Sequence, residues 1–300
     1  MKYAVIDIGS NSICLVVYEI NENNFKTLFK EKIMAGLAGY VKKGILTDEG
    51  IEKACSSLNE FKHILDSLSI SQCSVFATAS LRNISNTEAA VEKIYSLTGF
   101  KTEVVSGYDE AVFSCKGAMK DTDMENGVFI DIGGGSTEIA VLDKNEITQA
   151  VSIPLGSLKL YSEYVSKILP KKSEITTIKS RIKKSINDAL GKTNTVSDTI
   201  FCVGGTARAI LKIASALFGA NENKREITPS QLEKLSDMLC GSKKSAAELI
   251  LKNCPDRINT LIPGILILNE AAQKLQCEKI IVSKFGVREG YLCQRVLKKA

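Results

Sequence analysis

The stretch Val5-Ile-Asp-Ile-Gly-Ser-Asn-Ser12 reappears 124 residues later as Phe129-Ile-Asp-Ile-Gly-Gly-Gly-Ser136, with the aspartate, the first glycine and the last serine at equivalent places. The match continues without a gap into the apolar residues that follow each turn. This period is far too long for a solenoid, whose repeats run to about 20–50 residues. The repeat therefore predicts two lobes that are built alike.

Each copy is predicted to be a strand, a glycine turn and a second strand. The segments after the turns, 13–20 and 138–142, are rich in β-branched residues and too short to be helices. A P-loop or a dinucleotide-binding motif would instead continue into a helix. Glycines in such turns let backbone amides cradle a phosphate. The aspartate that ends each first strand, Asp7 or Asp131, suits magnesium or its waters.

The rest of the chain alternates strand and helix patterns, which predicts an α/β fold. We predict a strand over 73–79, a capping box Ser85-x-x-Glu88 at the start of the next helix, and a helix over 109–119. The polar stretch 121–126 is the predicted linker between the lobes.

Composition excludes several classes of protein. The chain has 300 residues, 44% of them hydrophobic, and no run of 18 uncharged apolar residues, so we expect no membrane helix. Asp7 interrupts the first apolar run, so we expect no signal peptide and a cytoplasmic location. The nine cysteines lack a C-x-x-C spacing and are expected to be reduced and mostly buried. His63 is the single histidine, so it is the one possible base for Ser-His-Asp chemistry, and nothing in the sequence around it indicates that role.

The formal net charge of +5 suits an anionic substrate without requiring one. Four lysine pairs recur along the chain, and a solvated surface accounts for most pairs of this kind. The sequence does not show whether they align in space. They are Lys42-Lys43, Lys171-Lys172, Lys183-Lys184 and Lys243-Lys244.

Two phosphate cradles do not by themselves separate a kinase, an ATPase and a phosphatase. A hydrolase needs a base that activates water beside the terminal phosphorus. Glu110 is the candidate, because it opens a helix at the carboxyl end of the predicted strand 102–105, and Asp109 is the adjacent alternative. The Arg82 guanidinium could hold a phosphoryl group with two parallel hydrogen bonds. Glu138, just after the second turn, could close with Asp131 on one metal ion.

These motifs together resemble the Ppx/GppA family of exopolyphosphatases and guanosine pentaphosphate phosphohydrolases, whose wider fold is that of actin, sugar kinases and the heat-shock ATPases. The resemblance implies two ribonuclease-H-like lobes with a cleft between them, 1–121 and 122–286, and a last helix, 287–300, that returns to the first lobe. The matching stretches run in family order over nearly the whole chain. They are Asp7-Ile-Gly-Ser-Asn-Ser12, Ala79-Ser-Leu-Arg82, Ser106-Gly-Tyr-Asp-Glu-Ala111, Asp131-Ile-Gly-Gly-Gly-Ser-Thr-Glu138, Gly204-Gly-Thr206, Pro263-Gly264 and Gly286-Val-Arg-Glu-Gly290.

The resemblance also implies roles for individual residues. Glu110 takes the place of the family's catalytic glutamate, and Arg82 acts beside it on the phosphoryl group. Asp131 and Glu138, with Asp7 nearby, would hold magnesium, with manganese as an alternative metal. Phosphate contacts are expected from the glycine turns: Gly9, Ser10, Asn11, Ser12, Gly133, Gly134, Gly135, Ser136, Gly205 and Thr206.

The implied activity is magnesium-dependent removal of the terminal phosphate of inorganic polyphosphate. Guanosine pentaphosphate is the rival substrate, an actin-like ATPase or sugar kinase is a more distant alternative, and a nucleotide sensor without turnover is a third class. Neither nucleic acid nor a membrane is an expected partner, and family analogy predicts a homodimer. Tyr108 stands where the family often has an acidic residue, while Asp109 keeps the charge. The chain ends soon after Gly290, which resembles the short two-domain form.

Overall fold

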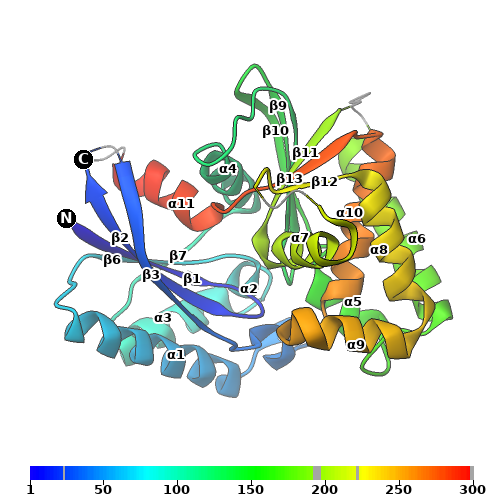
Figure 1. Cartoon of the computed structure of the whole chain (residues 1–300). Coiled ribbons are helices and arrows are strands. Elements are labelled where there is room, and N and C mark those ends of the chain that lie inside the picture. Colours follow the sequence, from blue (N-terminus) through cyan, green and yellow to red (C-terminus); the bar gives the residue numbers. More distant parts are fainter. Residues whose placement is uncertain (23, 192–196, 221–222, 298–300) are drawn as a thin grey trace. The chain divides into compact units, whose positions relative to one another are not determined.

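The computed structural model describes residues 1–22, 24–191, 197–220 and 223–297. The chain divides into two compact units (Figure 1): unit 1 is Met1–Glu110 with the residues from Tyr291 onward, and unit 2 is Ala111–Gly290. The chain thus changes units after Glu110 rather than in the polar stretch 121–126. Asp121 belongs to unit 2 because the Arg225 guanidinium and the Ser283 hydroxyl bind its carboxylate there.

Unit 1 is built on a five-stranded sheet in the order β3-β2-β1-β6-β7, in which the first three strands are antiparallel and the last two run parallel to β1. Aliphatic side chains of β1, β2 and the first long helix form its core. The strands are β1 (Lys2–Ile8), β2 (Ile13–Asn21), β3 (Asn24–Ile33), β6 (Cys73–Ala77) and β7 (Thr102–Val104), and a separate ribbon pairs β4 (Val41–Lys42) with β5 (Ile45–Leu46). The helices are η1 (Leu37–Tyr40), α1 (Asp48–Ser67), α2 (Ala79–Arg82) and α3 (Thr87–Thr98).

Two local predictions in unit 1 are wrong. The strand predicted over 73–79 ends at Ala77, because Ala79 already begins α2. Ser85 does not form a capping box: its hydroxyl donates to the carbonyl oxygen of Gly44 at 3.2 Å, and α3 begins only at Thr87. The Ser85 amide also donates to the Gly44 carbonyl at 2.7 Å, so Ser85 is held outside the helix and Asn86 takes the N-cap position.

The chain from Tyr291 onward is held to unit 1 by a small network. The Tyr291 ring stacks on Phe76 with centroids 4.6 Å apart, and its hydroxyl donates to Glu103 at 2.8 Å. Arg295 also donates to Glu103, at 3.2 Å. This segment leaves α11 (Val287–Tyr291) and continues as a π-helical turn, η3 (Leu292–Val296).

Unit 2 has a six-stranded sheet in the order β10-β9-β8-β11-β13-β12, with β8, β11 and β13 parallel and the other three antiparallel to their neighbours. A large aliphatic core lies between one face of the sheet and its helices, and residues of α4 pack on the other face. The strands are β8 (Gly127–Ile132), β9 (Thr137–Asp143), β10 (Glu146–Ile153), β11 (Thr199–Val203), β12 (Glu226–Ile227) and β13 (Lys279–Val282). The helices are α4 (Gly107–Ala118), which begins in unit 1, α5 (Ser157–Tyr164), α6 (Lys172–Leu190), α7 (Gly204–Phe218), α8 (Pro229–Gly241), α9 (Lys243–Asn253), η2 (Pro255–Arg257) and α10 (Leu261–Leu275).

The sequence repeat is reproduced strand by strand. β1 pairs with β2 so that Asp7 lies opposite Cys14, and β8 pairs with β9 so that Asp131 lies opposite Glu138. Both residues of the second pair follow those of the first by the same offset of 124. A parallel strand, β6 or β11, flanks each hairpin. The predicted α/β class with two lobes built alike is therefore confirmed.

No helix among the described residues is long and apolar enough to cross a membrane. All nine cysteines carry free thiols, as expected, and seven of them are buried.

Candidate active site

The two glycine turns have the same backbone hydrogen bond. The amide of Gly9 donates to the carbonyl oxygen of Ser12 at 3.1 Å, and the amide of Gly133 donates to that of Ser136 at 2.9 Å. A Cβ atom on Gly9 or Gly133 would lie only 2.9 Å or 3.0 Å from the same serine oxygen. Glycine is therefore required at the first position of each turn, because a side chain would collide with the backbone that closes it.

The carbonyl groups of the turns are tied to neighbouring backbone, whereas the amides are not. In the first turn, Gly36 and Ala38 donate to the carbonyl oxygens of Asn11 and Ser10, each at 2.9 Å. Within the described residues, the amides of 10–12 and 134–136 donate to no acceptor. Several unengaged amides in one turn form a site that favours an anion, so phosphate binding by these two turns stays a prediction that their geometry allows.

The second turn is braced by the start of α5. The amide and hydroxyl of Ser157 donate to the carbonyl oxygen of Gly133 at 2.9 and 3.0 Å, and the amide of Lys159 donates to that of Gly134 at 2.9 Å. Gly156 permits this contact, since a Cβ atom there would lie 2.2 Å from the Gly134 oxygen. The first residues of α5 thus fix the carbonyl side of the turn and leave its amide side exposed to a ligand.

Two carboxylates adjoin the second turn. Asp131 and Glu138 lie opposite each other on β8 and β9, so their side chains project from the same face of the sheet. Asp131 accepts a hydrogen bond from Ser114 at 2.9 Å, and the almost fully buried Glu138 accepts one from Ser152 at 2.7 Å. Burial raises the pKa of Asp131, and the Ser114 hydrogen bond opposes that shift.

This carboxylate pair fits magnesium. Magnesium prefers hard oxygen ligands and usually keeps several waters or phosphate oxygens alongside one or two carboxylates. The described residues contain no group of three or more His, Cys, Asp or Glu side chains that could hold a metal, so a pair is the largest set available here. Asp7 has no carboxylate partner across its ladder, because Cys14 lies opposite it and a thiol is a poor ligand for magnesium.

Glu110 and Arg82 form an ion pair in unit 1. Nη1 of Arg82 donates to Oε2 of Glu110 at 2.6 Å and to the carbonyl oxygen of Val105 at 3.1 Å. The side chain of Glu110 is 9% exposed and that of Arg82 18% exposed. The guanidinium therefore holds the Glu110 carboxylate by a charge-assisted hydrogen bond and restricts its orientation.

Asp109, the alternative base, has a structural role. Its carboxylate accepts a hydrogen bond from the Ser106 hydroxyl at 2.8 Å, and its amide donates to the same oxygen at 3.0 Å. These two hydrogen bonds between Ser106 and Asp109 stabilise the first turn of α4, which begins at Gly107, two residues before the predicted start. Tyr108, in the same turn, is 61% exposed. Of the two neighbouring carboxylates, Glu110 is the one that is not used to cap the helix.

The third glycine turn, at the start of α7, presents its backbone rather than its side chains. Thr206 is 1% exposed and packs on Gly264, where a Cβ atom would lie 2.5 Å from its methyl group. Its hydroxyl is therefore directed into the core, which leaves the backbone amide as the group that can meet a phosphate. Gly205 leaves room for the Arg257 guanidinium, since a Cβ atom on it would lie 1.8 Å from Nη2.

Three arginines of unit 2 near these turns were not predicted. Arg257 lies on Gly205, and the charges of Arg208 and Arg288 both lower the pKa of Asp131. Arg208 follows the Gly204-Gly205-Thr206 turn within one turn of helix, and Arg288 lies within a stretch that matched the family. The sequence positions of Arg208 and Arg288 beside these motifs could therefore have predicted both residues. The approach of Arg257 to Gly205 depends on how η2 packs and has no such signal.

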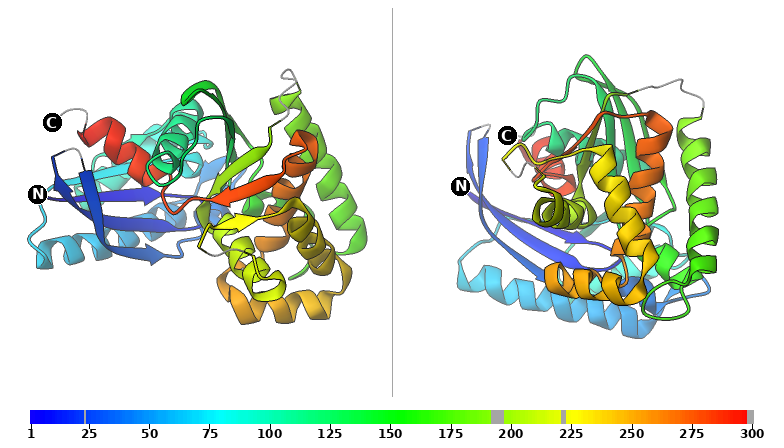
Figure 2. Two further views of the ribbon diagram at one scale, coloured as in Figure 1. Left: turned by 45° about the horizontal axis from the view of Figure 1, so that its top comes forward. Right: turned by 45° about the vertical axis from the view of Figure 1, so that its right-hand side comes forward.

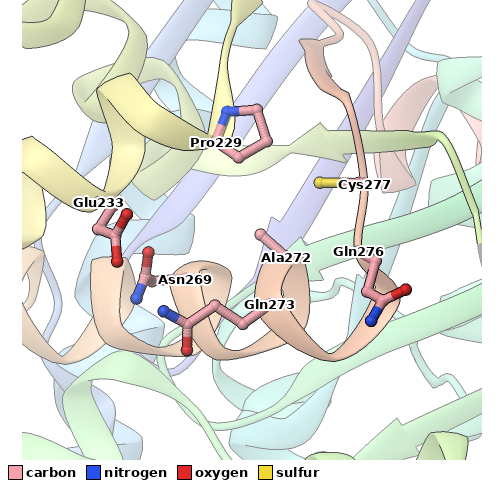
Figure 3. A pocket seen from close by; sticks show the side chains of 7 residues that line it. All are labelled: Pro229, Glu233, Asn269, Ala272, Gln273, Gln276 and Cys277. Atoms are coloured by element: carbon pink, nitrogen blue, oxygen red, sulfur yellow. The ribbon is translucent and has the colours of Figure 1, made fainter.

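A cavity of about 230 Å³ in unit 2 is lined by none of these residues (Figure 3). Its lining holds one carboxylate, that of Glu233, and no lysine or arginine, so it does not suit an anionic substrate. It is formed by α8, α10 and the turn after α10, and its lining residues are Pro229, Glu233, Asn269, Ala272, Gln273, Gln276 and Cys277.

Comparison with known proteins finds a phosphatase family and proteins named as phosphatases. The model of the Ppx/GppA phosphatase family matches residues 16–299. The chain is 27% identical to a bifunctional 3-dehydroquinate synthase/phosphatase of Fusobacterium nucleatum, over 99% of this chain and 47% of that protein. The chain therefore spans about half the length of that relative. It is 22% identical to exopolyphosphatase 1 of Mycobacterium leprae, over 100% of this chain and 91% of that protein.

Solved structures show the same fold. An exopolyphosphatase from Cytophaga hutchinsonii superposes with a TM-score of 0.86 at 22% identity, covering 100% of this chain and 99% of that one. A Ppx/GppA family member from Aquifex aeolicus gives a TM-score of 0.81 at 24% identity, covering 100% and 98%. The predicted fold class of two actin-like lobes is confirmed.

Proposed function

The chain belongs to the Ppx/GppA phosphatase family, and from this premise we propose that it is a magnesium-dependent exopolyphosphatase that releases orthophosphate from the end of inorganic polyphosphate. The observation that carries the proposal is the duplicated glycine turn, in which the amides of 10–12 and of 134–136 donate to no described residue. Such amides stabilise phosphoryl oxygens, and a polymer of phosphates presents little else for a protein to bind.

The proposed reaction is an in-line hydrolysis. The turn amides bind the terminal phosphoryl group and offset the charge on its oxygens. Glu110 accepts a proton from water as the water oxygen bonds to phosphorus, and the bridging P–O bond breaks so that the shortened chain leaves with the electron pair. Arg82 orients the Glu110 carboxylate before the substrate arrives. Magnesium held by Asp131 and Glu138 would neutralise further phosphoryl charge.

Guanosine pentaphosphate is the second candidate substrate, because its terminal phosphoanhydride presents the same group to the same amides. The deciding assay measures released phosphate, with magnesium, from long-chain polyphosphate, guanosine pentaphosphate and ATP at matched concentrations of terminal phosphate. We expect the strongest release from polyphosphate. Release from the guanosine nucleotide alone would retain the mechanism and change the substrate, whereas release from ATP alone would contradict the phosphatase reaction.

The proposed base is tested by Glu110→Gln, which should lower turnover on the order of 10²–10⁴-fold because the amide cannot accept the proton. Asp109→Asn is the matched control: it removes a neighbouring carboxylate but retains an acceptor for the start of α4. Its turnover should stay within a few-fold of the wild type. Near-normal turnover of Glu110→Gln with normal substrate binding would show that Glu110 is not the base.

A further inference from the structure

One segment of unit 2 carries a high net positive charge. Residues 157–190, which comprise α5, α6 and their connection, contain eight Lys or Arg and three Asp or Glu, a net charge of +5. Charge collected in this way points to an anionic partner more strongly than the same number of scattered lysines does.

The segment begins at the second glycine turn. The amide of Lys159, in the first turn of α5, donates to the carbonyl oxygen of Gly134, which places this lysine next to the candidate phosphate site. The chain then continues through α5 and the connection 165–171 to α6, which packs against α10, as α8 does (Figure 2). The surface of α6 thus follows the candidate site in the chain after one short helix and this connection.

The outer face of α6 carries lysines at helical spacing. Lys172, Lys179 and Lys183 are exposed and separated by seven and four residues, which aligns them along one side of the helix. The opposite side is aliphatic and buried, with Ile175, Ile178, Ile182 and Ile186 in the core. Because the buried stripe fixes the rotation of the helix, the lysine row must face solvent.

The start of α9 extends this row. Lys243 donates from Nζ to the carbonyl oxygen of Leu169 at 3.1 Å, which attaches the first turn of α9 to the segment just before α6. Its neighbour Lys244 is exposed. Burial raises the pKa of the Cys240 thiol at the end of α8, and the charge of Lys179 opposes that shift, so α6 also passes close to this corner. Three of the four lysine pairs thus come from adjoining elements of unit 2.

Acidic residues do not neutralise the row. Within the described part of the chain, Lys172, Lys179, Lys183 and Lys244 have no carboxylate within 4.0 Å. Glu174 is occupied by the Ser166 hydroxyl and the Lys171 amide, and the ion pair of Lys159 with Glu163 is 4.0 Å long and partly exposed. Unpaired like charges repel one another, and a bound anion would relieve that repulsion.

We propose that the row formed by Lys172, Lys179, Lys183, Lys243 and Lys244, here called the α6 lysine row, binds the distal phosphates of a long polyphosphate whose end is held at the second glycine turn. The proposal rests on the proposed function. Neither α6 nor α9 carries an aromatic residue on which bases could stack, which favours polyphosphate over single-stranded nucleic acid. The row would raise affinity for long chains without contacting the reacting phosphoryl group.

The test uses the full chain and the double variant Lys179→Gln/Lys183→Gln, with Lys42→Gln/Lys43→Gln in unit 1 as the matched control that removes the same charge. For chains of several hundred phosphates we expect the KM of the α6 variant to rise about tenfold at low salt with kcat unchanged. Its KM for tripolyphosphate should not change, because that substrate ends before the row. The slope of log KM for long chains against log salt should fall by roughly one to two units. The control variant should match the wild type in all three measurements.

Equal changes for long chains and tripolyphosphate, or no change for either, would overturn the proposal. Binding of end-labelled long polyphosphate in EDTA, measured by fluorescence anisotropy, separates this proposal from the proposed function. If the wild type releases no phosphate, the function fails, and the row still predicts weaker binding by the α6 variant. If that variant loses binding to a single-stranded oligonucleotide while polyphosphate binding is unchanged, the row serves nucleic acid and the proposal is wrong.

Discussion

The two glycine turns share their backbone but differ in the side chain that faces the aspartate. In unit 1, Asp7 lies opposite the buried Cys14, whereas in unit 2, Asp131 lies opposite Glu138. The hydrogen bond that closes each turn is the same. The duplication therefore retains two cradles for phosphate but only one pair of facing carboxylates. On the proposed mechanism the lobes divide the work, because amides alone can bind an anion whereas a metal needs anionic ligands.

The turns also differ in what fixes them. Gly36 and Ala38, from the loop after β3, hold the first turn, and the start of α5 holds the second. In unit 2 a Cβ atom built on Gly156 would lie 2.2 Å from the Gly134 oxygen, whereas in unit 1 a Cβ atom built on Gly36 would meet nothing within 4 Å beyond its chain neighbours. The second turn is the more closely packed of the two, so it should tolerate less change.

The largest expected effect compares the two aspartates. Asp131→Asn should lower kcat about 10³-fold. It removes one carboxylate of the proposed metal-binding pair, and with it several kcal/mol of charge stabilisation in the transition state. Asp7→Asn should cost about tenfold, because no carboxylate lies opposite it to share a metal. Steady-state kinetics on polyphosphate over a range of magnesium concentrations makes the comparison. Equal losses would mean that the lobes do not divide the work in this way.

The next effect concerns the bracing of the turns. Gly156→Ala should lower kcat/KM about 100-fold, because a Cβ atom 2.2 Å from the Gly134 oxygen must displace the second turn. It should also lower the free energy of unfolding by about 1–3 kcal/mol. Gly36→Ala should cost about 1 kcal/mol for its positive φ of 61° and leave activity within a few-fold. Urea unfolding and steady-state kinetics of both variants make the comparison. Larger losses of stability and activity in Gly36→Ala than in Gly156→Ala would refute the difference in packing.

A smaller effect is expected from the hydroxyl that orients Glu138. Ser152→Ala removes the 2.7 Å hydrogen bond to Oε1 of Glu138. The magnesium concentration for half-maximal activity should rise about tenfold, which is typical for loss of a group that orients a metal ligand. The kcat at saturating magnesium should stay near that of the wild type. An unchanged magnesium requirement would argue against Glu138 as a ligand.

The smallest effect concerns stability and pH. Asp121 accepts hydrogen bonds from Arg225, from the amide of Lys284 at 2.7 Å and from Ser283 at 3.1 Å. Burial alone would raise the pKa of Asp121, but these donors outweigh it and hold the pKa below its ordinary value of 3.8. A carboxyl whose pKa is depressed in the folded state stabilises the protein above its ordinary pKa, and this contribution is lost as the pH falls through the lower folded value.

Asp121→Asn should therefore lower the free energy of unfolding by about 1–2 kcal/mol at pH 7. The difference from the wild type should shrink as the pH falls below 4, where the wild-type carboxyl begins to be protonated. Exposed Asp123→Asn is the control and should change little at either pH. Urea unfolding at several pH values makes the measurement. A difference that does not depend on pH would assign the effect to packing and not to the charge.

The hairpins could be predicted because their signals are local. A glycine turn between two short β-branched segments specifies a hairpin, and its repetition at a fixed offset specified two lobes. The start of α8 also depends on neighbouring residues alone, since the Thr228 hydroxyl accepts a hydrogen bond from the Gln231 amide and Pro229 follows Thr228 at the first helical position. Such features depend on residues within a few positions of one another.

The predictions that failed depended on distant partners. Ser85 has the composition of a helix cap, but the Gly44 carbonyl reaches its hydroxyl from another part of unit 1. The polar stretch 121–126 reads as a linker, yet Asp121 is bound by Arg225, which lies just before β12 and 104 residues further along the chain. Composition cannot show such competition, because the second partner is set by how the elements pack.

The sequence by itself determined the duplicated hairpins, the glycine cradles, the positions of Asp131 and Glu138 beside the second turn, and that of Glu110 in the first turn of a helix. Local backbone chemistry is enough for these, since φ, ψ and strand alternation follow from neighbouring residues. Only the tertiary structure paired Arg82 with Glu110, placed the Arg257 guanidinium on Gly205, and attached Lys243 of α9 to the segment before α6. Contacts between segments far apart in the chain arise when apolar faces are buried against one another, and that packing decides which polar groups meet.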